Sequence, residues 1–98
     1  MTTETKIIED GEVLIHRVYD NGDDRYFDEN GCYHRPNKKP ALIDSDGYTA
    51  YCVHGKFHRT DGPAVIWPNG SEEYWMDDVN YDEENYWVEI ERLNSITN

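Results

Sequence analysis

The chain has 98 residues, of which 37% are apolar and 13% aromatic, and its formal net charge is −12 at pH 7. This length allows one domain with a thin core. The strong acidity disfavours general nucleic-acid binding, because phosphates would be repelled, and no apolar run is long enough to span a membrane.

The aromatic side chains favour a folded protein, since large rings bury much area per residue. The two cysteines, Cys32 and Cys52, are too few for a disulfide scaffold. The first residues lack the basic-then-apolar layout of a secretory signal. We therefore expect a cytoplasmic protein with reduced thiols.

In chain order, residues 1–6 are expected to be a loose N-terminus and residues 7–81 a β-meander. Asn21-Gly22, Asp46-Gly47 and Asn69-Gly70 each separate two short strand-like runs. Such dipeptides supply positive φ at both centres of a tight hairpin turn. Three successive hairpins predict about six short antiparallel strands.

Residues 82–94 are predicted to form a C-terminal helix. Tyr86, Ile90 and Leu93 recur at helical spacing, and Asp82 is a suitable N-cap. The helix would cap the sheet and cover its outermost strand. The whole chain, residues 1–98, is thus predicted as one domain that is mainly β.

A repeat occupies the middle of the chain. One copy begins at Gly31 and the next at Gly55, and Pro40 and Pro63 stand 23 residues apart (63−40). Fixed-period similarity is typical of stacked units that bury apolar faces against their neighbours. Tyrosines recur at the same place in each unit and are expected to stack as a ladder: Tyr26, Tyr51 and Tyr74.

The run from Gly55 to Ala64, followed by Gly70 and Tyr74-Trp75, resembles the G-x-x-H-R-x-D-G-P-A repeat of small proteins from bacteriophages and large DNA viruses. Those proteins are similar to MORN-type repeats. The resemblance implies a single-layer sheet of about three hairpin repeats, a helix after the last of them, and a phage origin. The copy at His34 departs from the motif, because it lacks the Asp-Gly pair.

The resemblance implies little chemistry. MORN-type repeats elsewhere are similar to platforms that bind proteins or lipids, but an acidic surface would be repelled by anionic headgroups, so we expect no membrane partner. No nucleophile elbow or phosphate-cradling glycine loop is present. The sequence therefore favours a protein that is not an enzyme.

The cysteines and histidines allow a zinc hypothesis. Cys32 with His34 and Cys52 with His54 provide two thiols and two imidazoles, which suit tetrahedral zinc. However, C-x-H is not a usual zinc spacing, and the two cysteines occupy different repeat positions. We therefore expect no metal and no other cofactor.

Two His-Arg pairs, His34-Arg35 and His58-Arg59, are candidates for a phosphate or carboxylate clamp. Because the pair recurs with the fold period, we favour a structural role: the histidine bonds to the backbone of a turn, and the arginine points to solvent or pairs with a carboxylate. The functional alternative is a nucleic-acid-binding or nucleic-acid-processing protein, in which the clamp belongs to a central His/Arg/Lys band of net charge +3 (residues 31–60).

Residues 61–98 carry ten acidic side chains and one basic side chain, a net charge of −9. A solvated outer face is the ordinary explanation of such a run. The functional hypothesis is an acidic surface that docks on a basic protein and is steered to it by charge. The leading prediction is therefore a non-enzymatic interaction module, an inhibitor or modulator of a host nucleic-acid-handling or defence protein. A homodimer through sheet edges stays open. The candidate partner-binding residues are Glu72, Glu73, Asp77, Asp78, Glu83, Glu84 and Trp87.

Overall fold

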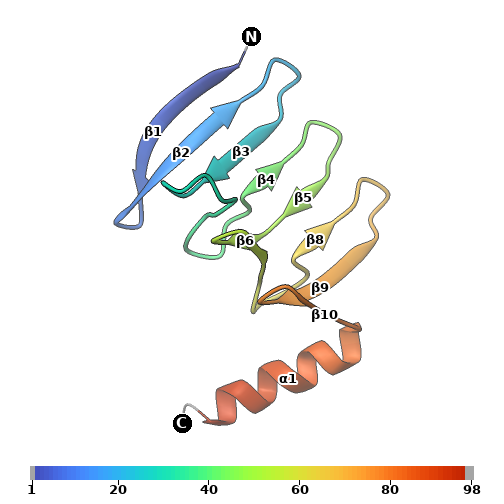
Figure 1. Cartoon of the computed structure of the whole chain (residues 1–98). Helices are drawn as coiled ribbons and strands as arrows, with labels where there is room; N and C mark the ends of the chain where they lie inside the picture. Colours follow the sequence, from blue (N-terminus) through green and yellow to red (C-terminus); the bar gives the residue numbers. More distant parts are fainter. Residues whose placement is uncertain (1, 97–98) are drawn as a thin grey trace.

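One antiparallel sheet runs through the molecule, and the hairpins follow each other along it in chain order (Figure 1). The protein is represented by a computed structural model that describes residues 2–96. Within these residues the sheet holds eight strands in the order β1-β2-β3-β4-β5-β8-β9-β10, and β6 and β7 form a separate ribbon. The principal-axis extents are 45 × 33 × 17 Å. The predicted mainly-β meander with one C-terminal helix is confirmed.

The first strands are β1 (Thr3–Glu9), β2 (Glu12–Val18), β3 (Asp24–Phe27), β4 (Leu42–Ile43) and β5 (Thr49–Ala50). The ribbon is made of β6 (Cys52–Val53) and β7 (Lys56–Phe57). The last strands are β8 (Val65–Ile66), β9 (Glu72–Met76) and β10 (Val79–Tyr81), and they precede the helix α1 (Glu83–Ile96).

The expectation of a loose N-terminus over residues 1–6 is wrong for the described part of that segment. β1 pairs with β2 along its whole length, from Thr3 opposite Val18 to Glu9 opposite Glu12. Ile7 packs against the core, and Arg17 donates to Glu4 at 2.7 Å. Residues 3–9 therefore form an additional strand of the sheet, joined to β2 by a two-residue turn. Met1 lies outside the described residues.

The three predicted hairpins are present, but their turns differ from the prediction. In each of these three turns the glycine has positive φ and the residue before it does not: φ is 93° at Gly22, 103° at Gly47 and 90° at Gly70. In each turn the glycine N–H donates to the carbonyl three residues earlier. A type I turn followed by a left-handed glycine explains this pattern. The side chain before each glycine accepts the N–H two residues ahead, and Asn21, Asp46 and Asn69 all do so at about 3 Å.

Positive φ at both central residues occurs instead in the turns between the hairpins. His54 and Gly55 have φ of 46° and 86°, and Asp77 and Asp78 have φ of 48° and 69°. These two turns join β6 to β7 and β9 to β10. They are the places where the histidines of the repeat make their contacts.

The predicted tyrosine ladder is wrong among the described residues. An arginine lies over each of the first two rings: Arg35 is 3.8 Å from the centre of the Tyr26 ring, and Arg59 is 4.0 Å from that of Tyr51. The third ring, Tyr74, is covered by Tyr86 of α1 at 4.8 Å. Cation–π contacts thus take the place of ring stacking.

The apolar core is thin and has two parts. The larger part contains seven buried residues: Leu14, Tyr26, Ala41, Leu42, Ala50, Cys52 and Val65. The smaller part contains Tyr74, Met76 and Tyr86, with Tyr81 and Ile90 packed against it. The smaller part joins the helix to β9 and β10.

The helix α1 begins one residue later and ends two residues later than predicted. Asp82 is its N-cap, as expected, because its Oδ1 accepts the N–H of Asn85 at 2.8 Å. The helix is fastened mainly by its first turn, since Tyr86 is fully buried whereas Leu93 is 38% exposed. No helix within residues 2–96 is long and apolar enough to cross a membrane.

Candidate functional site

The two repeat histidines close the turns of the following unit. Nδ1 of His34 accepts the backbone N–H of His54 at 3.0 Å, and Nδ1 of His58 accepts that of Asp77 at 3.0 Å. Both accepted N–H groups belong to left-handed residues. These bonds are the structural role that the sequence favoured for the histidines. Left-handed φ is unfavourable for residues other than glycine, and the hydrogen bond to the histidine stabilises each of these turns.

The two repeat arginines also have equivalent partners. Arg35 donates to the carbonyl of Pro40 at 3.1 Å, and Arg59 donates to that of Pro63 at 3.0 Å. Arg35 also forks onto Glu9 at 2.8 and 3.2 Å, and Arg59 donates to Asp61 at 2.8 Å. The guanidinium of Arg35 lowers the pKa of Glu9 below its usual value, mainly through the hydrogen bond.

One hollow of about 350 Å³ brings both His-Arg pairs together. His34, Arg35, His58 and Arg59 all line it, so the four residues of the candidate clamp do share a surface. Both arginines, however, already hold carboxylates of this chain. A phosphate bound by either arginine would have to compete with Glu9 or Asp61, and the bidentate Arg35–Glu9 pair resists such exchange.

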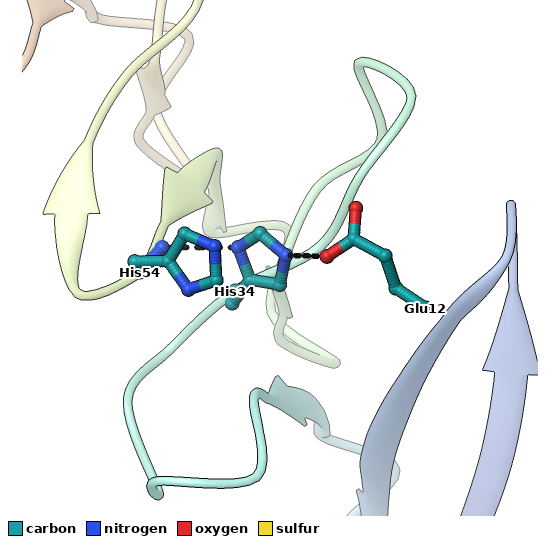
Figure 2. Close-up of side chains that lie close together, drawn as sticks. All are labelled: Glu12, His34 and His54. Atoms are coloured by element: carbon teal, nitrogen blue, oxygen red, sulfur yellow. Dashed lines mark hydrogen bonds and ion pairs between the residues drawn. The ribbon is translucent and has the colours of Figure 1, made fainter.

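The wall of this hollow contains a cluster that sequence reasoning missed in part (Figure 2). One donor atom each from Glu12, His34 and His54 lies within 4.8 Å of the others. Because Nδ1 of His34 accepts an N–H, its Nε2 carries the proton and donates to Glu12 at 2.8 Å. No periodic signal could have found Glu12, since it comes from the β1–β2 hairpin, outside the repeat.

The cluster does not form a metal cage. In Figure 2 the ring of His34 lies between Glu12 and His54, and its two nitrogens point to opposite sides. The two imidazole rings stack at 3.8 Å with an angle of 14° between their planes. Their in-plane lone pairs therefore lie in two nearly parallel, separate planes and cannot converge on an ion about 2.1 Å from each nitrogen. The arrangement is a chain of hydrogen bonds.

A second carboxylate, Asp28, holds His54 from the other side. Oδ2 of Asp28 bonds Nδ1 of His54 at 2.8 Å, and Oδ1 accepts the N–H groups of Asn30 and Cys32 at 2.9 and 3.0 Å. Burial raises the pKa of Asp28, but the hydrogen bonds from His54 and the backbone outweigh it, and the net pKa is lowered. Asp28 and Glu12 thus anchor the stacked pair of histidines.

The cysteines take no part in this cluster. Cys32 is exposed and lies against the turn residue Gly55: a Cβ at Gly55 would be 3.4 Å from the Cβ of Cys32. Cys52 is buried in the core, and burial raises the pKa of its thiol to about 12. A thiol that resists ionisation is a poor zinc ligand. The hypothetical two-cysteine, two-histidine site is therefore not assembled among residues 2–96.

The predicted partner-binding residues lie at the opposite end of the sheet from β1, on β9, the β9–β10 turn and the start of α1. Three of the seven interact with other residues of the same chain. Glu73 accepts the indole N–H groups of Trp67 and Trp75, and Asp78 accepts the N–H of Phe57. Burial, and after it the neighbouring Glu83, raise the pKa of Tyr74. The other three carboxylates of the set, Glu72, Asp77 and Glu84, are exposed.

Apolar groups lie among these carboxylates. Trp87 is 41% exposed and meets the rings of Tyr74 and Tyr86 with its edge. A shallow groove of about 270 Å³ runs between α1 and β10, lined by Val79 (53% exposed) and Leu93 with Asp77 and Glu89 beside them. The structure therefore places Trp87, one of the candidate partner-binding residues, at the border of the core.

Comparison with known proteins adds no relative: no family model, no curated protein and no solved structure matches this chain.

Proposed function

We propose that this chain is a non-enzymatic protein-interaction module, phage-encoded, that inhibits or modulates a basic host protein involved in nucleic-acid handling or defence. The observation that carries the proposal is the acidic surface at the β9–α1 end. There, solvent-facing carboxylates (Glu72, Asp77, Glu84) surround exposed apolar groups. In the histidine hollow, by contrast, His34 and Arg35 are already paired with Glu12 and Glu9 of this chain.

The chemistry of this surface suits a basic partner. Residues 61–98 have a net charge of −9, and electrostatic attraction of this kind raises association rates and makes them sensitive to salt. Charge alone gives little affinity, so an interface also needs apolar anchors. Trp87 and the Val79–Leu93 groove supply them, and an aliphatic side chain flanked by lysine or arginine would fit the groove.

The test compares two variants with the same net charge. In the first, the solvent-facing carboxylates are neutralised together (Glu72→Gln, Asp77→Asn, Glu84→Gln). In the matched control, three exposed carboxylates distant from α1 are neutralised instead (Asp10→Asn, Glu29→Gln, Asp46→Asn). Each tagged protein is used to capture partners from a bacterial lysate at low and at high salt.

The expected result is one stoichiometric basic protein whose capture falls with salt and falls at least about tenfold in the first variant, whereas the control retains it. Trp87→Ala should weaken capture at both salt concentrations, because it removes an apolar anchor. Equal capture by the two charge variants, or no stoichiometric partner at all, would refute the proposal.

A further inference from the structure

Among residues 2–96, the sheet has one uncovered edge. β1 stands first in the strand order and pairs only with β2 among the described strands, whereas the strands at the other end are packed against α1 (Figure 1). β1 is seven residues long, and its Ile8 is 76% exposed. Long uncovered edges offer a row of unpaired N–H and C=O groups to another strand.

The direction of these free groups follows from the β1–β2 turn. Asp10 and Gly11 form a two-residue turn, with φ of 52° and 80°, closed by Glu9 opposite Glu12. The closing pair of such a turn exchanges both main-chain hydrogen bonds, and every second pair along the ladder does the same. The odd-numbered residues of β1 therefore bond to β2, and the N–H and C=O groups of Glu4, Lys6 and Ile8 point outward.

We propose that the outer edge of β1 pairs antiparallel with β1 of a second copy of this chain, about a two-fold axis at Thr5. This register places Glu4 of each copy opposite Lys6 of the other, and these are the residues whose backbone groups point outward. Thr5 lies opposite Thr5, and Thr3 lies opposite Ile7. The two sheets then join into one continuous sheet across the axis.

Charge complementarity selects this register over its neighbours. A shift of the axis to Lys6 would place two lysines opposite each other, which is destabilising. In the register centred on Thr5, Glu4 of one copy is flanked by Arg17 of its own chain and by Lys6 of the second copy. Lys6 lies 3.9 Å from Glu29 of its own chain, so acidic and basic side chains alternate across the axis. The edge therefore complements itself. The inference is independent of the proposed function, because the acidic surface lies at the other end of the sheet.

The test measures the solution mass by sedimentation from micromolar to millimolar concentration. We expect a reversible shift from the monomer mass of 11.6 kDa to twice that value. Lys6→Pro should abolish the shift, because proline blocks the outward N–H yet removes no bond to β2. The Glu4 and Lys6 amides should exchange with solvent more slowly at high concentration, and only in the wild type.

Charge exchange provides the second arm. Lys6→Glu should weaken dimerisation about tenfold or more by placing two acids opposite each other. Lys56→Glu, at an exposed position on β7, is the control with the same change of charge. A monomer at every concentration, or a dimer that Lys6→Pro leaves unchanged, overturns the proposal.

Discussion

The two His-Arg units use the same contacts in different surroundings. In the first, the side chain of His34 is 4% exposed, bonds Glu12 through Nε2 and stacks on His54. In the second, the side chain of His58 is 27% exposed, and the position of His54 is taken by Asp77, whose carboxylate lies 3.5 Å from Nδ1. A repeat therefore conserves the bond that closes the turn, while its neighbours decide how deeply that bond is buried.

The arginines differ in the same way. Arg35 reaches Glu9, 26 residues earlier in the chain, and so ties the β1–β2 hairpin to the first unit. Arg59 reaches Asp61, only two residues away. The arginine of the first unit thus pairs with a carboxylate of a distant segment, whereas the arginine of the second pairs with a carboxylate of its own unit.

The largest expected difference concerns the histidines. His34→Ala should lower the free energy of unfolding by about 2–4 kcal/mol, because it leaves a cavity and takes the acceptor from the His54 N–H. His58→Ala should cost only about 1 kcal/mol, since water can reach the Asp77 N–H. Urea unfolding measures both. His34→Asn, which keeps an acceptor on a smaller side chain, should recover part of the loss; equal costs for the two alanine variants would contradict the comparison.

The arginines should show a smaller difference. Arg35→Ala is expected to cost about 2 kcal/mol and Arg59→Ala about 1 kcal/mol, because only the first loses a bidentate pair between distant segments. A double-mutant cycle with Glu9→Gln isolates that pair. Absence of coupling between Arg35 and Glu9 would show that Arg35 acts through its contact with Tyr26 alone.

Acid should destabilise the contacts of the first unit. The pKa values of Glu9 and Asp28 are lowered from 4.5 and 3.8, so their contributions are complete above those unfolded values and are lost as the pH falls through the lower folded values. Glu9→Gln and Asp28→Asn should therefore flatten the loss of stability below about pH 4.5. Unfolding followed at several pH values tests this, and the surface change Glu29→Gln, which should leave the slope unaltered, is the control.

The smallest expected effect leaves stability unchanged and contrasts the two cysteines. Burial raises the pKa of Cys52 to about 12, so its thiol stays protonated at pH 8, whereas Cys32 is exposed. Alkylation of the native protein should modify Cys32 alone, as mass spectrometry can show. Rapid modification in a Cys32→Ser variant would mean that Cys52 is accessible.

The hairpins could be predicted from the sequence because the signals are local. A glycine after Asn or Asp, flanked by short apolar runs, predicts a turn from a few residues. The helix of residues 82–94 is predicted by its N-cap and by the helical spacing of its apolar residues. The strand β1 was missed because Thr3–Lys6 has polar side chains. It is held by the partner strand β2 and by the Glu4–Arg17 pair, neither of which a local pattern contains.

The sequence by itself determined the repeat, its period and the acidic character of residues 61–98, since these depend on residue types and spacing. Only the tertiary structure decided what those residues contact. It placed Arg35 over the ring of Tyr26, paired Glu12 and Asp28 with the histidines, and left the edge of β1 uncovered among the described residues. The physical reason is that such contacts join different strands and turns, and their geometry exists only once neighbouring units are stacked.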